Sequence, residues 1–323
     1  MRSVLRAGGA ARGVALRAVL GIMVSALCIT GCSSGPSQVG AAAFVNGTEI
    51  PVEQVQSQLT TVLVKEGDQA RTQLAADHQL DDLSRKIITV QIRHELTAIA
   101  ARRAGLTVDQ ARVSRLISEV GGAQGASKGT IFDADGYRQR AVDKLLTAQL
   151  GLSALRNSAV TVDYTTADTR TAAKAKVDEL SRAGAKQARQ LIDADVRAGK
   201  DAVIGKRIVA ADDPIFATTP AFGMAEGTVV AFQLSDTTPW LIMVIKNRTN
   251  RGVQPSDNAP ALEQIDPAVL EAIGLRQLAQ VGEEVGVRLS PRYGTWDPVS
   301  LQAVANENET AGFLAPLRAV PRT

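Results

Sequence analysis

The first ordered pattern in the chain is a pair of short apolar segments on either side of a tight turn. The segments span 42–45 and 48–50, and Asn46-Gly47 between them is typical of a two-residue hairpin turn, because both residues tolerate positive φ. Pro51 follows, at a position where the first turn of a helix needs no N–H. The pattern predicts a strand, a turn, a second strand and an amphipathic helix, whose apolar residues recur at helical spacing: Val52, Val55, Leu59, Val62 and Leu63.

Three more helices are predicted in the N-terminal half. The segment 82–104 is apolar over a broad face, as expected of a helix that is buried on most sides. The next helix begins at Thr107, with Gln110 three residues later in a capping-box pattern. A glycine-rich loop, GGAQGASKG, separates it from a helix over 137–155. This half is therefore predicted to be a helical module that starts with a hairpin.

A second domain is predicted over 158–250. Its pattern is a strand, then two helices, then two late strands around a turn. This order favours a small α+β domain rather than an extension of the helical module. The predicted elements span 161–165, 170–182, 185–198, 228–233 and 240–246.

The chain then returns to a helical pattern. A helix over 266–285 is predicted from Asp266 as N-cap and Pro267 at the first helical position. An extended segment and a turn that carries Trp296 follow it. The tail over 304–323 has too little apolar periodicity to offset the entropy of ordering, and we predict that it is disordered.

The N-terminus has the pattern of an export signal. Residues 1–31 contain four arginines and no acidic residue, and 18–29 are apolar apart from Gly21 and Ser25. A spanning helix needs about 20 apolar residues, and this run is shorter. The segment is therefore predicted to be a secretory signal that is cleaved, which places the rest of the chain outside the cytoplasm.

The end of this signal resembles a bacterial lipobox, with Ile29, Thr30 and Gly31 before Cys32. The resemblance implies a diacylglyceryl thioether on Cys32, a polar tether over 32–41 and attachment to the cell membrane. Cys28 is the competing candidate, but the residue before it is a bulky leucine. The other interpretation is a plain secretory signal with an incidental cysteine.

Cleavage changes what the composition indicates. Removal of Arg2, Arg6, Arg12 and Arg17 from the 36 basic residues leaves 32 against 33 acidic residues. The processed chain is nearly neutral and has no clustered basic segment, so no nucleic-acid partner is predicted. Because Cys28 leaves with the signal and Cys32 carries lipid, no disulfide is predicted.

Candidate chemistry is sparse. The two histidines, His78 and His94, lie in the helical module and are interpreted as ordinary surface or interface residues. Metal sites need several convergent ligands, so neither a metal nor a cofactor is predicted. Adjacent acidic residues such as Asp81 and Asp82 are expected to face water. No serine has a histidine in a plausible triad order, which disfavours a hydrolase.

Two segments behind the lipobox resemble the N-terminal domain of SurA- and PrsA-like periplasmic foldases. They are AAAFVNGTEIPVEQV and ARRAGLTVDQARVSRLI, and the resemblance covers about 42–155. It implies a chaperone domain whose N-terminal helices are joined by a helix from after the central domain, the role we assign to 266–285. The closing SPRYGTWDP is similar to lipoproteins of this type in actinobacteria. The expected fold is α+β and mainly helical, with the helical domain formed by 42–157 and 262–300.

The central domain resembles a parvulin, a prolyl isomerase in which an early and a late strand each carry a histidine. VTVDYTTADTRTAAKAKVDEL is similar to the opening of that domain and TPWLIMVIKNR to its closing strand. This register puts Tyr164 and Leu241 where the histidines belong, and the family's glycine-rich segment is missing. We therefore expect a degenerate parvulin-like domain with no catalytic residue. Weak activity stays open, because prolyl isomerisation needs no nucleophile.

The sequence therefore predicts a membrane-anchored extracytoplasmic chaperone-like lipoprotein that binds unfolded or exported polypeptides. Leucine, isoleucine and valine exposed in a cradle between the helical module and the central domain are expected to hold these clients. One alternative is a peptidyl-prolyl cis-trans isomerase of parvulin type. Another is a non-catalytic envelope protein with one dedicated partner.

Overall fold

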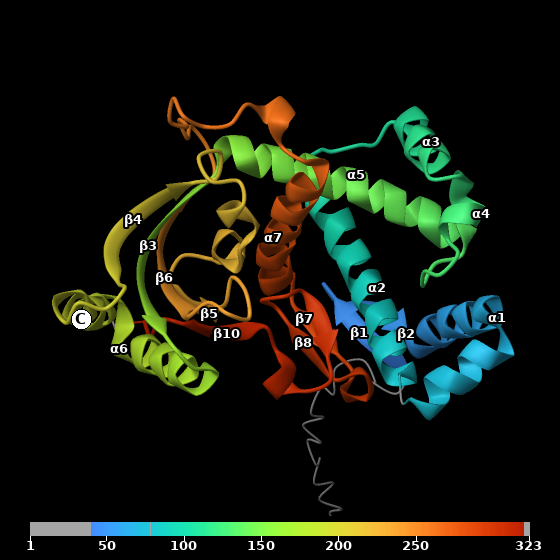
Figure 1. Cartoon of the computed structure of the whole chain (residues 1–323), viewed down its shortest axis with the longest axis horizontal. Coiled ribbons are helices and arrows are strands. Elements are labelled where there is room, and N and C mark those ends of the chain that lie inside the picture. The colour runs from blue at the N-terminus through green and yellow to red at the C-terminus, as the bar shows by residue number, and fades with distance from the viewer. Residues whose placement is uncertain (1–39, 78, 320–323) are drawn as a thin grey trace, which may run out of the picture. The chain divides into compact units, whose positions relative to one another are not determined.

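The computed structural model describes residues 40–77 and 79–319 (Figure 1). The predicted signal, the lipidation candidate Cys32 and His78 lie outside these residues. The described part contains helices and antiparallel sheets of three, five and two strands. The predicted α+β class is confirmed. Among the described helices, none combines the length and apolar character needed to cross a membrane.

The predicted hairpin opens the described part of the chain. Strands β1 (Ala41–Val45) and β2 (Thr48–Pro51) are antiparallel, and Asn46 and Gly47 between them have φ of 53° and 76°. Positive φ at both residues is what a type I′ turn requires. A third strand, β7 (Val287–Leu289), pairs with the other edge of β1. The hairpin is thereby tied to the C-terminal part of the chain.

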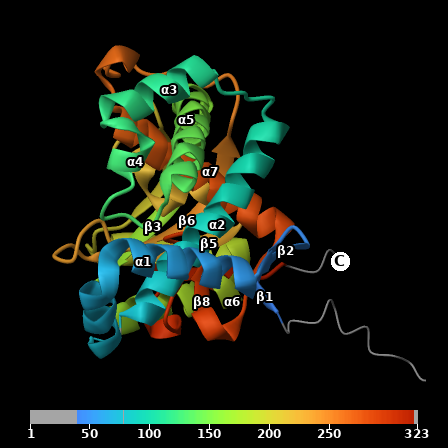
Figure 2. The ribbon, with the colours of Figure 1, turned by 90° about the vertical axis from the view of Figure 1, so that its right-hand side faces the viewer.

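The helical module consists of α1 to α5 together with α7, and Figure 2 shows α1 and α5 on opposite sides of it. Helix α7 packs against α5 and α2, which confirms that a helix from after the central domain completes the module. The side chain of Asp266 accepts a hydrogen bond from Ala268 N at 2.7 Å, as expected of an N-cap. The helices are α1 (Val52–Ala76), α2 (Leu80–Arg103), α3 (Gln110–Glu119), α4 (Gly122–Ala126), α5 (Ala134–Asn157) and α7 (Pro267–Val285).

Two local predictions in this module are wrong. The N-cap of α3 is Asp109, whose carboxylate accepts from Ala111 N at 2.9 Å, and not Thr107. Asp109 makes the same type of cap as a threonine would and starts the helix two residues later. The glycine-rich segment is not an open loop, because its middle forms α4, which packs against α5 and α3.

The second sheet has five antiparallel strands in the order β10-β5-β6-β3-β4. Helix α6 (Arg170–Arg197) covers one face and breaks at Gly184, where φ is 71°, so the two predicted helices exist as two halves of one element. The other face joins the main core beneath the short helices η1 (Phe216–Thr218) and η2 (Pro220–Gly223). The strands are β3 (Ala159–Ala167), β4 (Val203–Val209), β5 (Thr228–Phe232), β6 (Trp240–Thr249) and β10 (Gly312–Pro316).

The prediction of a disordered tail is wrong for its described part. After η3 (Leu262–Gln264), α7, β7 and η4 (Pro291–Tyr293), the strands β8 (Thr295–Asp297) and β9 (Gln302–Val304) form a hairpin. Then η5 (Glu307–Glu309) leads into β10, which pairs with β5. The ring of Phe313 lies 5.6 Å from that of Trp240. Few apolar residues are enough here, because the tail completes a sheet that already exists.

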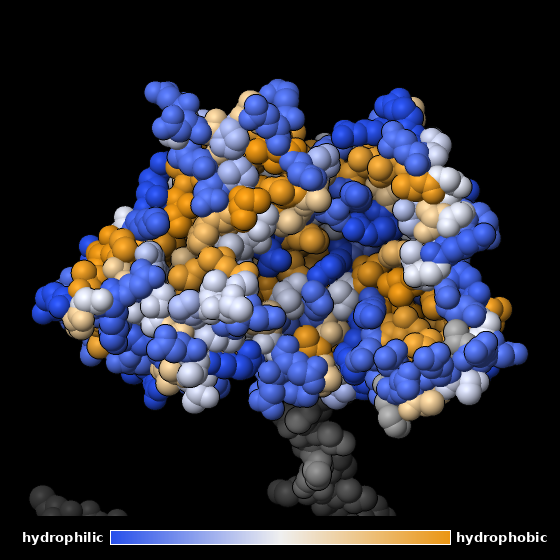
Figure 3. All heavy atoms as spheres, in the orientation of Figure 1, coloured by the Kyte–Doolittle hydropathy of each residue, from blue (hydrophilic) through white to orange (hydrophobic). Residues whose placement is uncertain are grey.

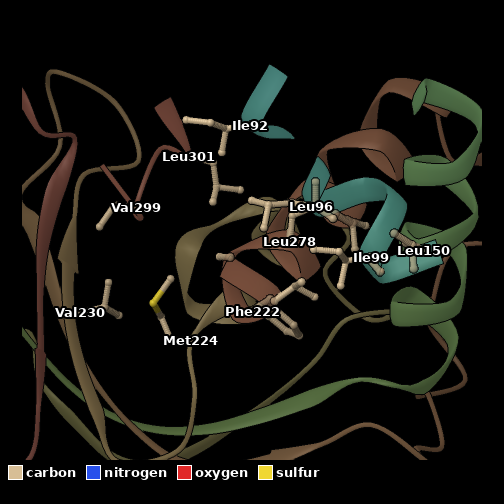
Figure 4. Packing of buried hydrophobic residues seen from close by; sticks show 14 of the residues in the cluster. Ile92, Leu96, Ile99, Leu150, Phe222, Met224, Val230, Leu278, Val299 and Leu301 are labelled. Atoms are coloured by element: carbon tan, nitrogen blue, oxygen red, sulfur yellow. The ribbon is translucent and has the colours of Figure 1, made fainter. Parts of the chain in front are cut away.

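The predicted apolar cradle between the two modules is also wrong. Figure 4 shows Leu96 and Leu278 of the helical module in one packed group with Phe222, Met224 and Val230 of the sheet domain, and all five are buried. One core therefore fills the space that the cradle would need. Hydrophobic residues on the face in Figure 3 lie among hydrophilic ones. The large apolar side chains that are exposed in the described part belong to different elements: Val64, Val120, Val196, Ile215 and Leu234.

Candidate functional site

A hollow inside the helical module is the strongest candidate for a binding site. It is a cavity of about 220 Å³ between β2, α1, α2 and the N-terminal part of α5. Figure 3 shows hydrophilic residues gathered in the region between α2 and α5, with hydrophobic residues beside them. The lining residues are Glu49, Ile50, Gln54, Gln58, Val90, Gln91, His94, Glu95, Phe132, Gly136, Gln139, Arg140 and Asp143.

Glutamine side chains form a directed chain of hydrogen bonds along one wall. Gln58 Nε2 donates to the carbonyl oxygen of Ile131 at 3.1 Å, and Gln91 Nε2 donates to Gln58 Oε1 at 2.9 Å. The first bond fixes the orientation of the Gln58 amide, and the second then fixes that of Gln91. Gln91 Oε1 is left buried without a hydrogen-bond partner among the described residues. Such an acceptor costs about 1–3 kcal/mol when it stays unpaired.

A histidine–carboxylate pair lies about one helical turn from Gln91, between α2 and α5. His94 Nδ1 on α2 is 3.0 Å from both carboxylate oxygens of Asp143 on α5, and Gln139 Nε2 donates to Asp143 Oδ1 at 3.2 Å. The hydrogen bond to Asp143 raises the pKa of His94, although burial of the ring acts in the opposite direction. His94 was interpreted as an ordinary histidine. In the structure it has a specific acidic partner and lines the hollow.

A cluster of charged residues between α5 and α7 lies next to the hollow. Arg140 pairs with Glu271 of α7, and Lys144 Nζ lies 3.9 Å from the same carboxylate. A smaller cavity of about 60 Å³ lies beside this pair, and Arg93 lines it. Arg93 Nε donates to the carbonyl oxygen of Leu301 at 2.8 Å, and burial lowers the pKa of Arg93 to about 10. The hydrogen bonds from Arg93 to Leu301 and Ser300 hold the C-terminal segment against α2.

The loop that carries Phe132 is held in place by one lysine. Lys65 Nζ of α1 donates to the carbonyl oxygens of Ser127 and Phe132, both at 2.8 Å, and also to that of Thr130. A single ammonium group thus satisfies three carbonyls of a segment without regular structure. The ring of Phe132 packs edge-on against Tyr137 and is partly exposed at the hollow.

The two predicted parvulin positions lie elsewhere, in the five-stranded sheet. Tyr164 of β3 is opposite Met243 of β6, and Leu241 of β6 is opposite Thr166 of β3, so Tyr164 and Leu241 share one face. The hydroxyl of Tyr164 donates to Asp201 Oδ1 at 3.2 Å, and burial raises the pKa of Tyr164. Neither residue lines the hollow. Within the described residues, no group of three or more histidine, cysteine or carboxylate side chains is arranged to hold a metal ion.

The comparisons with known proteins concern the part of the chain that builds the hollow. Residues 1–149 match the family model of the SurA-like N-terminal domain. All residues that line the hollow, from Glu49 to Asp143, lie inside the matched segment. A search of curated proteins gave no match to this chain. A domain of this family indicates a chaperone-like folding helper with unfolded polypeptides as clients.

Proposed function

We propose that this chain is a membrane-anchored extracytoplasmic chaperone-like lipoprotein that binds unfolded or exported polypeptides. We further propose that the hollow between α1, α2 and α5 is part of its binding surface. The observation that carries the proposal is that the segment similar to a SurA-like N-terminal domain contains this hollow. The apolar cradle expected between the two modules is filled by core, so it has no part in the proposal.

The lining of the hollow suits an extended polypeptide of variable sequence. Glutamine side chains both donate and accept hydrogen bonds, as backbone amides do. Gln54, Gln58 and Gln139 can therefore bind the main chain of a client without selecting its side chains. Val90 and the partly exposed ring of Phe132 supply apolar contact. This combination supports binding of many clients rather than of one folded partner.

The proposed lipid anchor limits the distance between the hollow and the membrane. Gly40, the first described residue, lies eight positions after Cys32, and an extended chain spans at most about 3.3–3.6 Å per residue. A lipid on Cys32 would therefore hold β1 within roughly 30 Å of the membrane surface. In this proposal, the hollow meets polypeptides soon after they leave the membrane.

The five-stranded domain is proposed to be a degenerate parvulin-like scaffold without a catalytic role. The face that carries Tyr164 and Leu241 also carries Met243 and Val230, which are buried against the main core. A substrate proline would have to displace this packing to reach the middle of the sheet. The domain instead supports α7, because Arg248 of β6 donates to Gln277 Oε1 at 2.6 Å.

The direct test uses the full-length chain and a permanently unfolded protein, fluorescently labelled α-lactalbumin that has been reduced and carboxymethylated. We expect binding by fluorescence anisotropy and suppression of the aggregation of a heat-unfolded client. Gln54→Trp should fill the hollow and weaken binding about fivefold or more, since it removes contact area and an amide. Gln187→Trp, at an exposed position of α6, is the matched control and should bind as the wild type does.

Three results would overturn the proposal. The full-length chain could fail to bind the unfolded protein. It could instead retain a single protein in stoichiometric amount, which would favour the dedicated-partner alternative. Acceleration of proline-limited refolding that Tyr164→Ala abolishes would show that the sheet domain is an isomerase.

A further inference from the structure

The hollow has an excess of negative charge among its lining residues. Glu49, Glu95 and Asp143 are acidic, and His94 and Arg140 are the basic residues of the lining. Both bases already have acidic partners, because His94 contacts Asp143 and Arg140 pairs with Glu271 behind the wall. In residues 40–77 and 79–319, no basic side chain forms an ion pair with Glu49 or Glu95. Two carboxylates are therefore available to a ligand.

A buried hydrogen-bond acceptor in the hollow also favours a basic ligand. Gln91 is only 8% exposed, and its Oε1 has no partner within the described residues. Its amide cannot simply be turned over, because Nε2 donates to Gln58 Oε1, and Gln58 Nε2 in turn donates to the carbonyl of Ile131. The group that would satisfy this oxygen must be a donor. Ammonium and guanidinium groups are donors only, whereas a carboxylate would be repelled.

The size of the hollow fits one long side chain. A cavity needs about 10–15 Å³ to hold one water, whereas pockets for drug-sized ligands measure about 300–1,000 Å³. At about 220 Å³, the hollow lies between these limits. Val90 and Phe132 provide apolar surface for a methylene stem, and an aromatic ring attracts a cation placed over its face.

We propose that the hollow is a subsite for a single lysine or arginine side chain of a bound polypeptide. The stem packs on Val90 and Phe132, and the head group donates to Gln91 Oε1 and lies near Glu95 and Glu49. The inference rests on the proposed function, because the side chain is supplied by the client. It adds a preference for basic residues to a surface that otherwise binds main chain.

The test compares two labelled peptides on the full-length chain. Both consist of glycine, serine and alanine with blocked ends, and one residue in the middle is arginine or citrulline, which has nearly the same shape but no charge. We expect the arginine peptide to bind about tenfold more tightly in fluorescence anisotropy, because a charged donor forms a stronger hydrogen bond than a neutral one. Millimolar argininamide should compete only weakly. Equal competition by argininamide and peptide would show a site for a free small molecule and overturn the assignment to a client.

Two matched variants distinguish a specific subsite from a general effect of the protein's negative charge on peptide binding. Glu95→Gln should reduce the preference for arginine over citrulline to about twofold or less, because it removes a charge at the head group without changing the shape. Glu119→Gln, at an exposed position of α3, removes the same charge outside the hollow and should leave the preference unchanged. Equal effects of both variants would overturn the subsite.

The two proposals fail in different ways. If both peptides bind equally while the unfolded protein still binds, the basic subsite is wrong and the chaperone-like function stands. If the arginine peptide binds selectively but the unfolded protein does not bind, the subsite stands as a peptide site and the chaperone-like function is wrong.

Discussion

Gly151 of α5 and Gly274 of α7 face each other where the two helices cross. A Cβ on Gly151 would lie 1.8 Å from the carbonyl oxygen of Leu270, and a Cβ on Gly274 would lie 1.8 Å from that of Thr147. The obstructing atoms belong to the backbone, so no rotamer change can make room. The crossing joins the helix that follows the sheet domain to the N-terminal module, and it places Glu271 beside the hollow.

Replacement of one of these glycines should destabilise the whole molecule. Gly151→Ala would force α5 and α7 apart, and we expect the free energy of unfolding to fall by about 3 kcal/mol or more, at the upper end for overpacked cores. Urea denaturation followed by circular dichroism measures this change. Gly125→Ala is the control, because a Cβ on Gly125 would meet no neighbouring atom within 4 Å, and it should change stability by about 1 kcal/mol or less. Similar losses in both variants would contradict the close crossing.

The C-terminal strand β10 should contribute to the stability of the five-stranded sheet, as the other strands do. The ring of Phe313 lies 5.6 Å from that of Trp240, and the guanidinium of Arg170 lies 4.6 Å from the centroid of Phe313. We expect Phe313→Ala to lower the free energy of unfolding by about 2–3 kcal/mol, less than in a fully buried core because the ring is partly exposed.

Tryptophan fluorescence gives a local measure of the same change. In a Trp296→Phe background, Trp240 is the remaining tryptophan. Its emission should shift to longer wavelength in Phe313→Ala, because loss of the neighbouring ring admits water. Emission and stability that both stay unchanged would show that β10 does not cover Trp240.

The elements that could be predicted from the sequence have local signals. Asn46 and Gly47 both adopt the positive φ that their residue types tolerate, so the turn needs no information from the rest of the chain. Asp266 and Pro267 likewise start α7 through their own side chains. The boundary of α3 was missed because Thr107 and Asp109 are both good N-caps, and only packing selects between them.

The hollow could not be predicted in the same way, because its contacts are distant in sequence. His94 and Asp143 are separated by 49 positions, and Gln58 and Gln91 by 33. Each residue alone fits a solvated helix face. The cradle prediction failed for a related reason. A helical pattern shows which side of α7 is apolar but not how many partners bury it, and here α5, α2 and η2 all contact this helix.

Strands at the edges of the sheet also lacked a sequence signal. β4 is exposed at Gly205, Lys206 and Arg207, so it has no regular alternation of apolar and polar residues. β10 is only five residues long and pairs along its length with β5. Both strands obtain their stability from neighbours that are already in place, which a pattern of hydrophobic positions does not report.

The His94–Asp143 pair should make stability depend on pH. The hydrogen bond to Asp143 raises the pKa of His94 in the folded state. A raised folded-state pKa gives a stability contribution that is fully present below the unfolded-state value of about 6.5 and is lost as the pH rises through the folded-state pKa. We therefore expect the free energy of unfolding to fall as the pH increases above about 6.5. The change should be well below 1 kcal/mol, since the His94 side chain is 37% exposed.

The comparison with His94→Gln isolates this contribution. Glutamine does not titrate, so urea denaturation between pH 5 and 9 should show a smaller loss of stability above about pH 6.5 in the variant. The other histidine, His78, is present in both proteins and cancels in the difference. If the two stability curves run parallel over this range, the pair does not contribute.

Membrane attachment should depend on one of two neighbouring cysteines. Each buried methylene of a lipid chain contributes about 0.8 kcal/mol, so loss of a diacylglyceryl group removes most of the affinity for the membrane. We expect Cys32→Ser to abolish incorporation of radiolabelled palmitate and to reduce the membrane-bound fraction of the chain. Cys28→Ser is the matched control four positions upstream and should retain both, because Leu27 makes Cys28 a poor processing site. The opposite result would move the anchor to Cys28, lengthen the tether and allow the hollow to lie farther from the membrane.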